Sequence, residues 1–168
     1  MPPPVQYRGM SLLVPDNDSE WREFYAAARQ HRLVMRACTA CGRMRYPPTH
    51  ACPWCMELGW RWQAVSGRGT IYSYEIVVHA IQPGFKEWAP YPVVLVELDE
   101  QRGQPSPDEA LRIVTNLVTA NGTPESEQNV AIGKRVAVTF TDLSEHLALP
   151  QFTLTEEPPE GRRWRLPE

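Results

Sequence analysis

The segment Cys38–Cys55 reads CTACGRMRYPPTHACPWC, and it contains two Cys-x2-Cys pairs separated by ten residues. Each pair can fold into a tight turn that aims two sulfur atoms at one point. Two such pairs joined by a short loop are typical of a tetrahedral four-thiolate zinc site. The spacing therefore predicts one structural zinc ion, bound by Cys38, Cys41, Cys52 and Cys55.

Other uses of these cysteines match the sequence less well. A redox-active Cys-x2-Cys opens a helix in a βαβ unit, and no such unit is visible here. An iron site, or a ribbon that has lost its metal, stays open as an alternative. A closed four-sulfur site leaves no position for water, so we expect the metal to stabilise the ribbon rather than catalyse. Gly42 follows the first pair, whereas Met56 follows the second and predicts a less regular turn there.

Five arginines surround the cysteine pairs, and no acidic residue lies between Glu23 and Glu57. They form either a solvated basic face that balances the anionic zinc cluster, or a surface for the phosphates of a nucleic acid or a nucleotide-bearing thioester. Both interpretations remain open at the level of the sequence. The five residues are Arg29, Arg32, Arg36, Arg43 and Arg45.

Short strands with turn signals between them follow from Ser66 onward. Pro150 places the last strand at an edge or a bulge. Five short strands cannot bury both edges as a flat sheet, so a five-stranded Greek-key barrel is the economical arrangement. The predicted strands cover residues 70–78, 93–98, 111–118, 135–141 and 147–154.

One helix is expected ahead of the cysteine segment, with Asn17, Asp18 and Ser19 as candidate N-cap residues. Its apolar side chains recur at helical spacing and must be buried, either on the same chain or on another subunit. These side chains are Trp21, Phe24, Tyr25 and Ala28.

The two ends of the chain are rich in proline. The first residues predict an extended arm, either a free terminus or a segment that lies on a partner through Leu12, Leu13 and Val14. The last residues are charged and carry Trp164. The mainly β chain thus divides into an arm (1–17), a helix (18–32), a zinc ribbon (33–65), a barrel (66–155) and a tail (156–168).

Composition and charge exclude several classes of protein. The 168 residues are 42% hydrophobic and 22% charged, which suffices for a packed core. The net charge is −3 and the pI is about 5.8, which gives no support for wrapping a nucleic-acid backbone. Apolar runs are too short for a membrane span, and the start lacks a signal core, so we expect a cytoplasmic protein.

No complete active site is recognisable in the sequence. The four histidines share no ligand spacing, and there is neither a nucleophile elbow nor a phosphate-binding glycine loop. His79 follows a predicted strand and can lie at the barrel mouth or simply on the surface. The loop 84–91 carries Phe85, Trp88 and Tyr91, which form either a contact surface or a local loop core.

The order of these features resembles the zinc-ribbon/OB-fold acyl-CoA-associated family, long known as a domain of unknown function. The resemblance runs from about Trp21 to Phe152 and implies a rubredoxin-like ribbon followed by an OB-fold barrel. The loop at 100–110 is longer than is usual in that family. The motifs that carry the resemblance, besides the ribbon, are Gly67-x-Gly69-Thr70, Pro83-Gly84-Phe85, Tyr91-Pro92-Val93-Val94, Thr115-Asn116-Leu117 and Ile132-Gly133-x-x-Val136.

The resemblance implies an accessory subunit without catalytic residues of its own. Such subunits join a thiolase-like enzyme or a hot-dog-fold hydratase in a hetero-oligomer and help to form its acyl-CoA site, as in aldol-cleavage complexes of steroid side-chain breakdown. The alternative is a module that binds single-stranded nucleic acid through stacked aromatics, which the net acidity disfavours. The candidate partner or substrate contacts are Trp21, Phe24, Tyr25, Arg43, Arg45, His79, Phe85, Trp88 and Tyr91.

Overall fold

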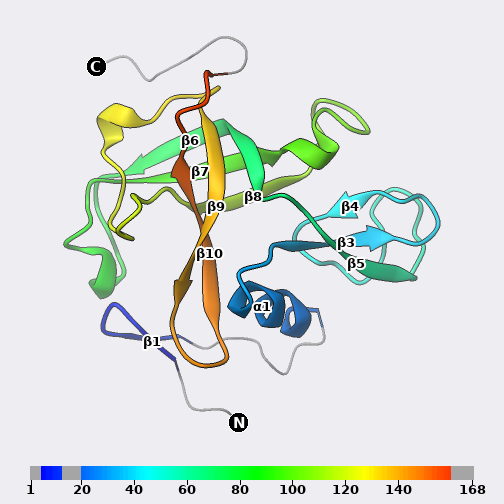
Figure 1. Ribbon diagram of the computed structural model, residues 1–168, viewed down its shortest axis with the longest axis horizontal. Coiled ribbons are helices and arrows are strands. Elements are labelled where there is room, and N and C mark those ends of the chain that lie inside the picture. Colours follow the sequence, from blue (N-terminus) through cyan, green and yellow to red (C-terminus); the bar gives the residue numbers. More distant parts are fainter. Residues whose placement is uncertain (1–4, 13–19, 160–168) are drawn as a thin grey trace.

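The computed structural model describes residues 5–12 and 20–159 and contains one helix, ten strands and three short 3-10 turns (Figure 1). The helix α1 spans Arg22–Arg29. The strands are β1 Val5–Tyr7, β2 Met10–Leu12, β3 Val34–Cys38, β4 Met44–Arg45, β5 Trp60–Ala64, β6 Arg68–Val77, β7 Tyr91–Leu98, β8 Arg112–Asn116, β9 Arg135–Asp142 and β10 Ala148–Leu154. The 3-10 turns are η1 Pro83–Phe85, η2 Asp99–Gln101 and η3 Glu127–Asn129.

Five antiparallel strands in the order β10-β9-β6-β7-β8 form the largest sheet. β6 is long enough to pair with β7 along most of its length and with β9 at its start. The sheet curls until Leu117 forms a bridge with Phe152 on β10, where the N–H of Val118 donates to the carbonyl of Phe152 at 2.8 Å. This nearly closed barrel confirms the predicted fold, and β10 takes the edge position expected from Pro150.

The barrel core follows from strand alternation. Along β7, Pro92, Val94, Val96 and Leu98 point inward and are buried, while the intervening residues keep part of their surface. Inward-facing side chains from β6, β8, β9 and β10 complete the same cluster. A period of two along a strand places one set of side chains on each face, so this pattern builds the interior of a barrel.

The ribbon is a separate three-stranded sheet in the order β4-β3-β5. Every residue of β3 is buried, because β3 lies between β4 and β5 and the rest of the ribbon wraps around it. Figure 1 shows the ribbon beside the barrel, with its loops directed away from it. The zinc-ribbon part of the predicted fold is therefore confirmed.

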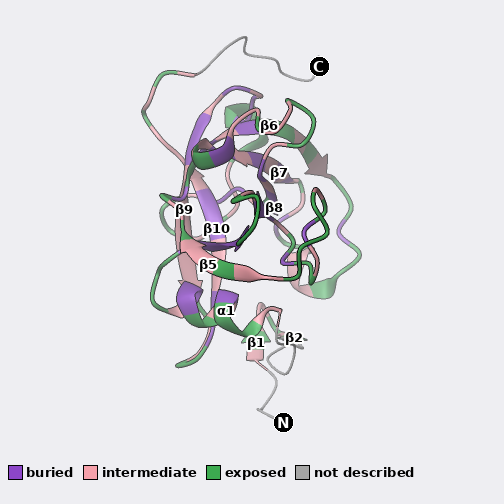
Figure 2. Cartoon of the chain, turned by 90° about the vertical axis from the view of Figure 1, so that its right-hand side faces the viewer, coloured by how far each residue is buried: buried purple, intermediate pink, exposed green. Residues whose placement is uncertain are grey.

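Helix α1 begins at Arg22 in the structure, and the candidate N-caps Asn17, Asp18 and Ser19 lie outside the described residues. Phe24, Ala27 and Ala28 are buried on one face, and the opposite face is exposed (Figure 2). This buried face contacts β10, β9 and β3 of the same chain. The helix thus joins the barrel to the ribbon.

The N-terminal segment folds back on the barrel. β1 and β2 form a two-stranded hairpin, whereas the arm was predicted to be extended throughout. Leu13, Val14 and Trp164 lie outside the described residues. Among the described residues, no helix is long and apolar enough to cross a membrane.

Candidate metal centre and docking surfaces

The four cysteine sulfurs converge at the end of the ribbon. All four Sγ atoms lie within 4.8 Å of one another. The Sγ atoms of Cys38 and Cys55 are 3.6 Å apart, as are those of Cys41 and Cys52. Tetrahedral coordination with Zn–S bonds of about 2.3 Å requires S–S separations of about 3.8 Å. The residues therefore fit one zinc ion, as the spacing predicts.

The two cysteine turns have the same backbone geometry. The N–H of Gly42 donates to the carbonyl of Cys38 at 3.0 Å, and the N–H of Met56 donates to the carbonyl of Cys52 at 2.9 Å. Both residues adopt positive φ, +74° for Gly42 and +61° for Met56. The expectation of a less regular second turn was wrong, because Met56 accepts the left-handed conformation that glycine adopts without strain.

The turns favour the thiolate form that zinc needs at Cys38 and Cys52. Hydrogen bonds from the backbone N–H of Cys41, and also of Ala40, lower the pKa of Cys38 to about 6, against its burial. For Cys52, burial raises the pKa, but backbone N–H groups of Trp54 and Cys55 outweigh it and the net shift is downward. At Cys55 the backbone N–H of Glu57 lowers the pKa, but burial and the other three cysteine sulfurs outweigh it and raise the pKa to about 12. Thiolates, not thiols, bind zinc. With four sulfurs and no open position, the bound ion would supply structural stabilisation.

Two of the five arginines lie inside the ribbon. Arg36 is 1% exposed, and its guanidinium carbon lies 3.9 Å from the ring centroid of Trp60. Arg45 is 3% exposed and donates from Nε to the carbonyl of Thr49 at 3.0 Å. These two arginines are therefore neither part of a solvated basic face nor available to bind phosphates. Their guanidinium groups donate hydrogen bonds to the Thr49 carbonyl, in the loop between the two cysteine pairs.

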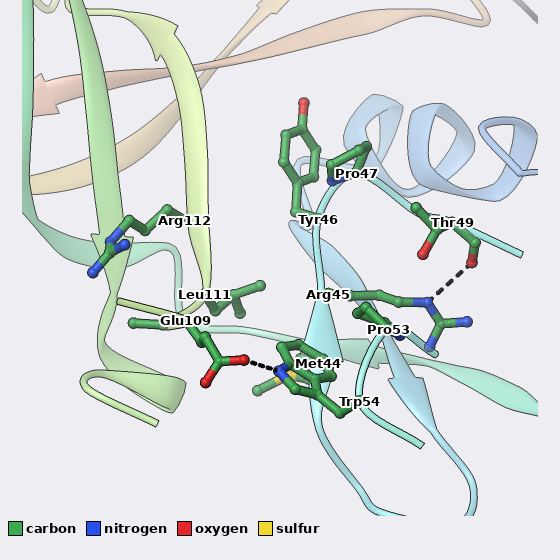
Figure 3. A pocket seen from close by; sticks show the side chains of 11 residues that line it. Met44, Arg45, Tyr46, Pro47, Thr49, Pro53, Trp54, Glu109, Leu111 and Arg112 are labelled. Atoms are coloured by element: carbon green, nitrogen blue, oxygen red, sulfur yellow. Dashed lines mark hydrogen bonds between the residues drawn. The ribbon is translucent and has the colours of Figure 1, made fainter. Parts of the chain in front are cut away.

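A cleft of about 380 Å³ separates the ribbon from the barrel (Figure 3). Met44, Tyr46 and Trp54 line the ribbon side, and Glu109 and Leu111 line the barrel side. The indole N–H of Trp54 donates to Glu109 Oε1 at 3.2 Å across the cleft. Arg43 lies next to this bond, its guanidinium carbon 5.8 Å from the Trp54 ring.

A buried side chain fixes the ribbon against the barrel. Gln101 of η2 accepts a hydrogen bond from the backbone N–H of Met44 at 2.7 Å and donates one to the Met44 carbonyl at 2.9 Å. The amide side chain thus pairs with Met44 as a neighbouring strand would. We name this pair of bonds the Gln101 clamp. It was not foreseen, since 57 positions separate the two residues.

The aromatic side chains of α1 belong mainly to the interior. Phe24 is buried, and Trp21 and Tyr25 are half-buried. Trp21 packs edge-to-face on Tyr46 of the ribbon, with ring centroids 5.8 Å apart. The apolar face of the helix was expected to pack either on its own chain or on another subunit. In the structure it packs on its own chain.

The aromatic loop forms a local cluster. Phe85 stacks on Tyr91 and meets Trp88 edge-on, with ring centroids 5.5 and 5.4 Å apart. Trp88 is only 7% exposed. His79 lies on the exposed loop between β6 and η1. The cluster thus agrees with the interpretation as a loop core, although its rim reaches the surface through Phe85 and Tyr91.

An apolar face on the outside of the barrel escaped the sequence analysis. Val114 of β8 is 61% exposed and pairs with Leu95 of β7, which is half-buried on the same outer face. Tyr72 of β6 is also exposed, and Arg112 covers its ring at 3.5 Å. The loop after β6 adds Ile81, which is 87% exposed. The sequence did contain a signal for this face. A solvated sheet face carries polar residues at alternate strand positions, whereas Val93, Leu95 and Val114 occupy such positions here.

Two family models match the chain, and both are named for ChsH2. The rubredoxin-like zinc ribbon domain of ChsH2 matches residues 26–57, and the C-terminal OB-fold domain of ChsH2 matches residues 62–141. The first match includes β3, β4 and all four cysteines, and the second begins within β5 and covers most of the barrel.

Individual relatives agree with the family models. A probable enoyl-CoA hydratase alpha subunit of Thermomonospora curvata is 35% identical over 77% of this chain, which spans only 35% of that protein's length. A DUF35 domain-containing scaffold protein of Methanothermobacter thermautotrophicus is 29% identical over 74% of this chain and 81% of its own length.

A solved structure extends the likeness to three dimensions. A chain of the "Ltp2-ChsH2(DUF35) aldolase" superposes with a TM-score of 0.66 at 33% identity, covering 84% of this chain and 98% of that one. With this likeness, the two family models and the four clustered cysteines, the chain is a member of the DUF35 family of ChsH2-like zinc-ribbon/OB-fold proteins.

Proposed function

We propose that this chain is an accessory subunit without catalytic residues of its own, which binds a thiolase-like enzyme of the aldolase or acyltransferase type. The observation that carries the proposal is its likeness to nearly the whole of one chain of the Ltp2-ChsH2(DUF35) aldolase, together with the two family models named for ChsH2. The coordination chemistry agrees, because a four-sulfur zinc site offers no position at which a substrate can react.

The outer face of the barrel is the docking surface that we propose for this partner. Tyr72, Leu95 and Val114 form an apolar patch on the outer face of β6, β7 and β8. The Arg112–Glu97 ion pair lies beside it, with N–O at 2.9 Å. An apolar centre with a charged rim is the usual anatomy of a protein interface. Ile81 extends the apolar surface on the loop that follows β6.

Co-expression with a thiolase-like subunit tests the docking surface. We expect the two proteins to elute together in size exclusion, and we expect Val114→Glu to separate them. The matched control is Gln128→Glu, which adds the same charge at an exposed position on η3. Separate elution of the wild-type proteins would contradict the proposal. If both variants still eluted with the partner, or neither did, the outer face around Val114 would not be the docking surface.

We further propose that the cleft side of the ribbon faces the acyl-CoA of the shared site, with Arg43 as the phosphate contact. Arg43 lies near Trp54, which lines the cleft, whereas the guanidinium of Arg45 is already bonded inside the ribbon. In the complex, Arg43→Ala should raise the acyl-CoA Kd about tenfold, as expected for one charge-assisted hydrogen bond. An unchanged Kd would remove Arg43 from the site.

The nucleic-acid alternative gains no support from the surface. Among residues 5–12 and 20–159, Tyr72 is the one exposed aromatic on a barrel strand, and Arg112 already covers its ring. Base stacking needs accessible aromatic faces along a basic groove. Salt-dependent retention of single-stranded DNA or RNA would restore this alternative.

A further inference from the structure

The N-terminal hairpin presents an arginine at its tip. Arg8 and Gly9 form the two-residue turn between β1 and β2, and both have positive φ, 53° and 73°. Two left-handed residues in a two-residue loop are the geometry that matches the twist of a hairpin. Glycine adopts this conformation freely, but Arg8 does so against its preference. We therefore expect the side chain of Arg8 to make contacts that offset the cost of its left-handed backbone conformation.

The side chain of Arg8 supplies that interaction. Its Nε donates to the carbonyl of Gly84 at 2.7 Å, and its guanidinium carbon lies 4.1 Å from the ring centroid of Trp88. Phe85 adds a second ring at 5.9 Å. A cation above an aromatic face and a hydrogen bond to a carbonyl together stabilise this half-buried arginine.

Shape complementarity limits what the site accepts. A Cβ at Gly84 would lie 2.5 Å from the Arg8 carbonyl oxygen and 2.8 Å from the terminal methyl of Met10. Position 84 therefore leaves room for the hairpin backbone only because it is glycine. Tyr7 adds an edge contact to Phe85, with centroids 6.0 Å apart, and its hydroxyl accepts a hydrogen bond from Gln151 at 3.4 Å.

The two halves of this contact differ in their relation to the family. The receiving residues Gly84, Phe85 and Trp88 lie within the stretch that matches the ChsH2 OB-fold domain, whereas the hairpin 5–12 precedes both matched stretches. The receiving surface is therefore part of the barrel, and a segment that precedes the matched stretches covers it.

We propose that Gly84, Phe85 and Trp88 form a binding site for an arginine carried on a peptide turn, which the hairpin 5–12 occupies as an internal ligand. The ligand class is a guanidinium group with an adjacent extended backbone. Release of the hairpin uncovers Phe85 and Trp88.

The first test follows the indole N–H signal of Trp88 by NMR in the full chain. Arg8→Ala should shift this signal and make amide hydrogen exchange at Phe85 and Trp88 about tenfold faster, since a cation–π contact and a charged hydrogen bond are lost. Arg61→Ala, an exposed ribbon arginine, is the matched control and should leave both unchanged. The other indole signals report whether the fold is intact.

The second test supplies the ligand in trans. A synthetic peptide of residues 1–12 added to the Arg8→Ala protein should return the Trp88 signal toward its wild-type position. The same peptide with Arg8→Ala should not do so at equal concentration, and Arg8→Lys should bind more weakly because an ammonium lacks the planar stacking face. An unmoved Trp88 signal in the Arg8→Ala protein, or equal binding of the arginine and alanine peptides, would overturn the proposal.

Discussion

The ribbon and the barrel reach stability by different means. The barrel buries a continuous cluster of side chains from all five of its strands. The ribbon has strands of two to five residues, and its interior contains two arginines whose guanidinium groups bond to backbone carbonyls. One of them, Arg36, also stacks on a tryptophan ring. A segment of this size cannot bury enough apolar surface alone, so it depends on metal coordination and on attachment to its neighbour.

Loss of the metal should have the largest effect and should separate the two regions. Cys52→Ser removes a buried ligand, and structural zinc sites contribute about 10 kcal/mol or more to folding. We expect the ribbon amide signals to collapse in NMR spectra while barrel signals persist, with zinc content falling well below one per chain by mass spectrometry. Met56→Leu, an exposed change beside the site, is the control. Cooperative unfolding of both regions would show that the barrel is not independent.

The ion-pair network of Arg135 should decide the stability of the barrel. Arg135 is buried and donates to both carboxylate oxygens of Asp99, at 2.7 and 2.5 Å, and Nε donates to Glu157. Arg135→Ala should lower the free energy of unfolding by about 3 kcal/mol, because it removes two charge-assisted hydrogen bonds and leaves the partly buried Asp99 with its ion pair to Arg102. Urea denaturation measures the loss, and Arg135→Lys should lose less than Arg135→Ala.

The same network predicts a pH dependence. Hydrogen bonds from Arg135 lower the pKa of Asp99 below its usual range, against its partial burial. A carboxylate whose folded pKa is depressed stabilises the protein above its unfolded pKa of about 3.9, and the contribution disappears as the pH falls through the folded value. The stability difference between wild type and Arg135→Ala should therefore narrow below about pH 4. A constant difference would contradict the role of Asp99.

The Gln101 clamp tests how far the two regions are coupled. Gln101→Leu leaves the N–H and carbonyl of Met44 without their side-chain partners, which should cost about 2 kcal/mol. We expect faster amide hydrogen exchange at Met44, with little change in the urea concentration at which half of the barrel is unfolded. Gln104→Leu, an exposed change in the same loop, is the control. If Gln101→Leu lowers the urea midpoint of the barrel as strongly as Arg135→Ala does, the ribbon and the barrel unfold as one cooperative unit.

The smallest expected effect compares the two cysteine turns. Met56→Gly relieves a left-handed side chain and should slow zinc release slightly, with a gain of about 0.5 kcal/mol after the entropy of glycine is counted. Gly42→Ala at the equivalent position should weaken zinc binding by about 1 kcal/mol, because alanine is strained at positive φ. Competition with a chromophoric chelator measures both. Equal zinc affinity in the two variants would mean that backbone strain does not control the site.

Much of the architecture follows from local patterns. The cysteine spacing led to the metal centre because four sulfurs at those intervals have few other uses. A run of apolar residues led to β7, and strand alternation led to β9. The helix face at Phe24 could be identified, but not its partner. Periodicity shows that a face is buried without showing against what.

The contacts that position the ribbon and the hairpin could not be predicted. Arg36 and Arg45 carry charge, so the sequence places them on the surface, yet aromatic rings and backbone carbonyls satisfy them inside. The bond from Arg8 to Gly84 joins residues 76 positions apart. Neither composition nor periodicity contains information about pairs so distant in the chain.

The Gln101 clamp also bears on how such a chain can be recombined. It is one-sided, since the barrel contributes a side chain and the ribbon contributes only the backbone of Met44. Any non-proline residue at position 44 offers the same N–H and carbonyl. A ribbon from a relative could therefore keep these two bonds whatever non-proline residue it carries at position 44, provided that the barrel keeps an amide at position 101. The side-chain contacts across the junction, such as that of Trp54 with Glu109, would still have to match.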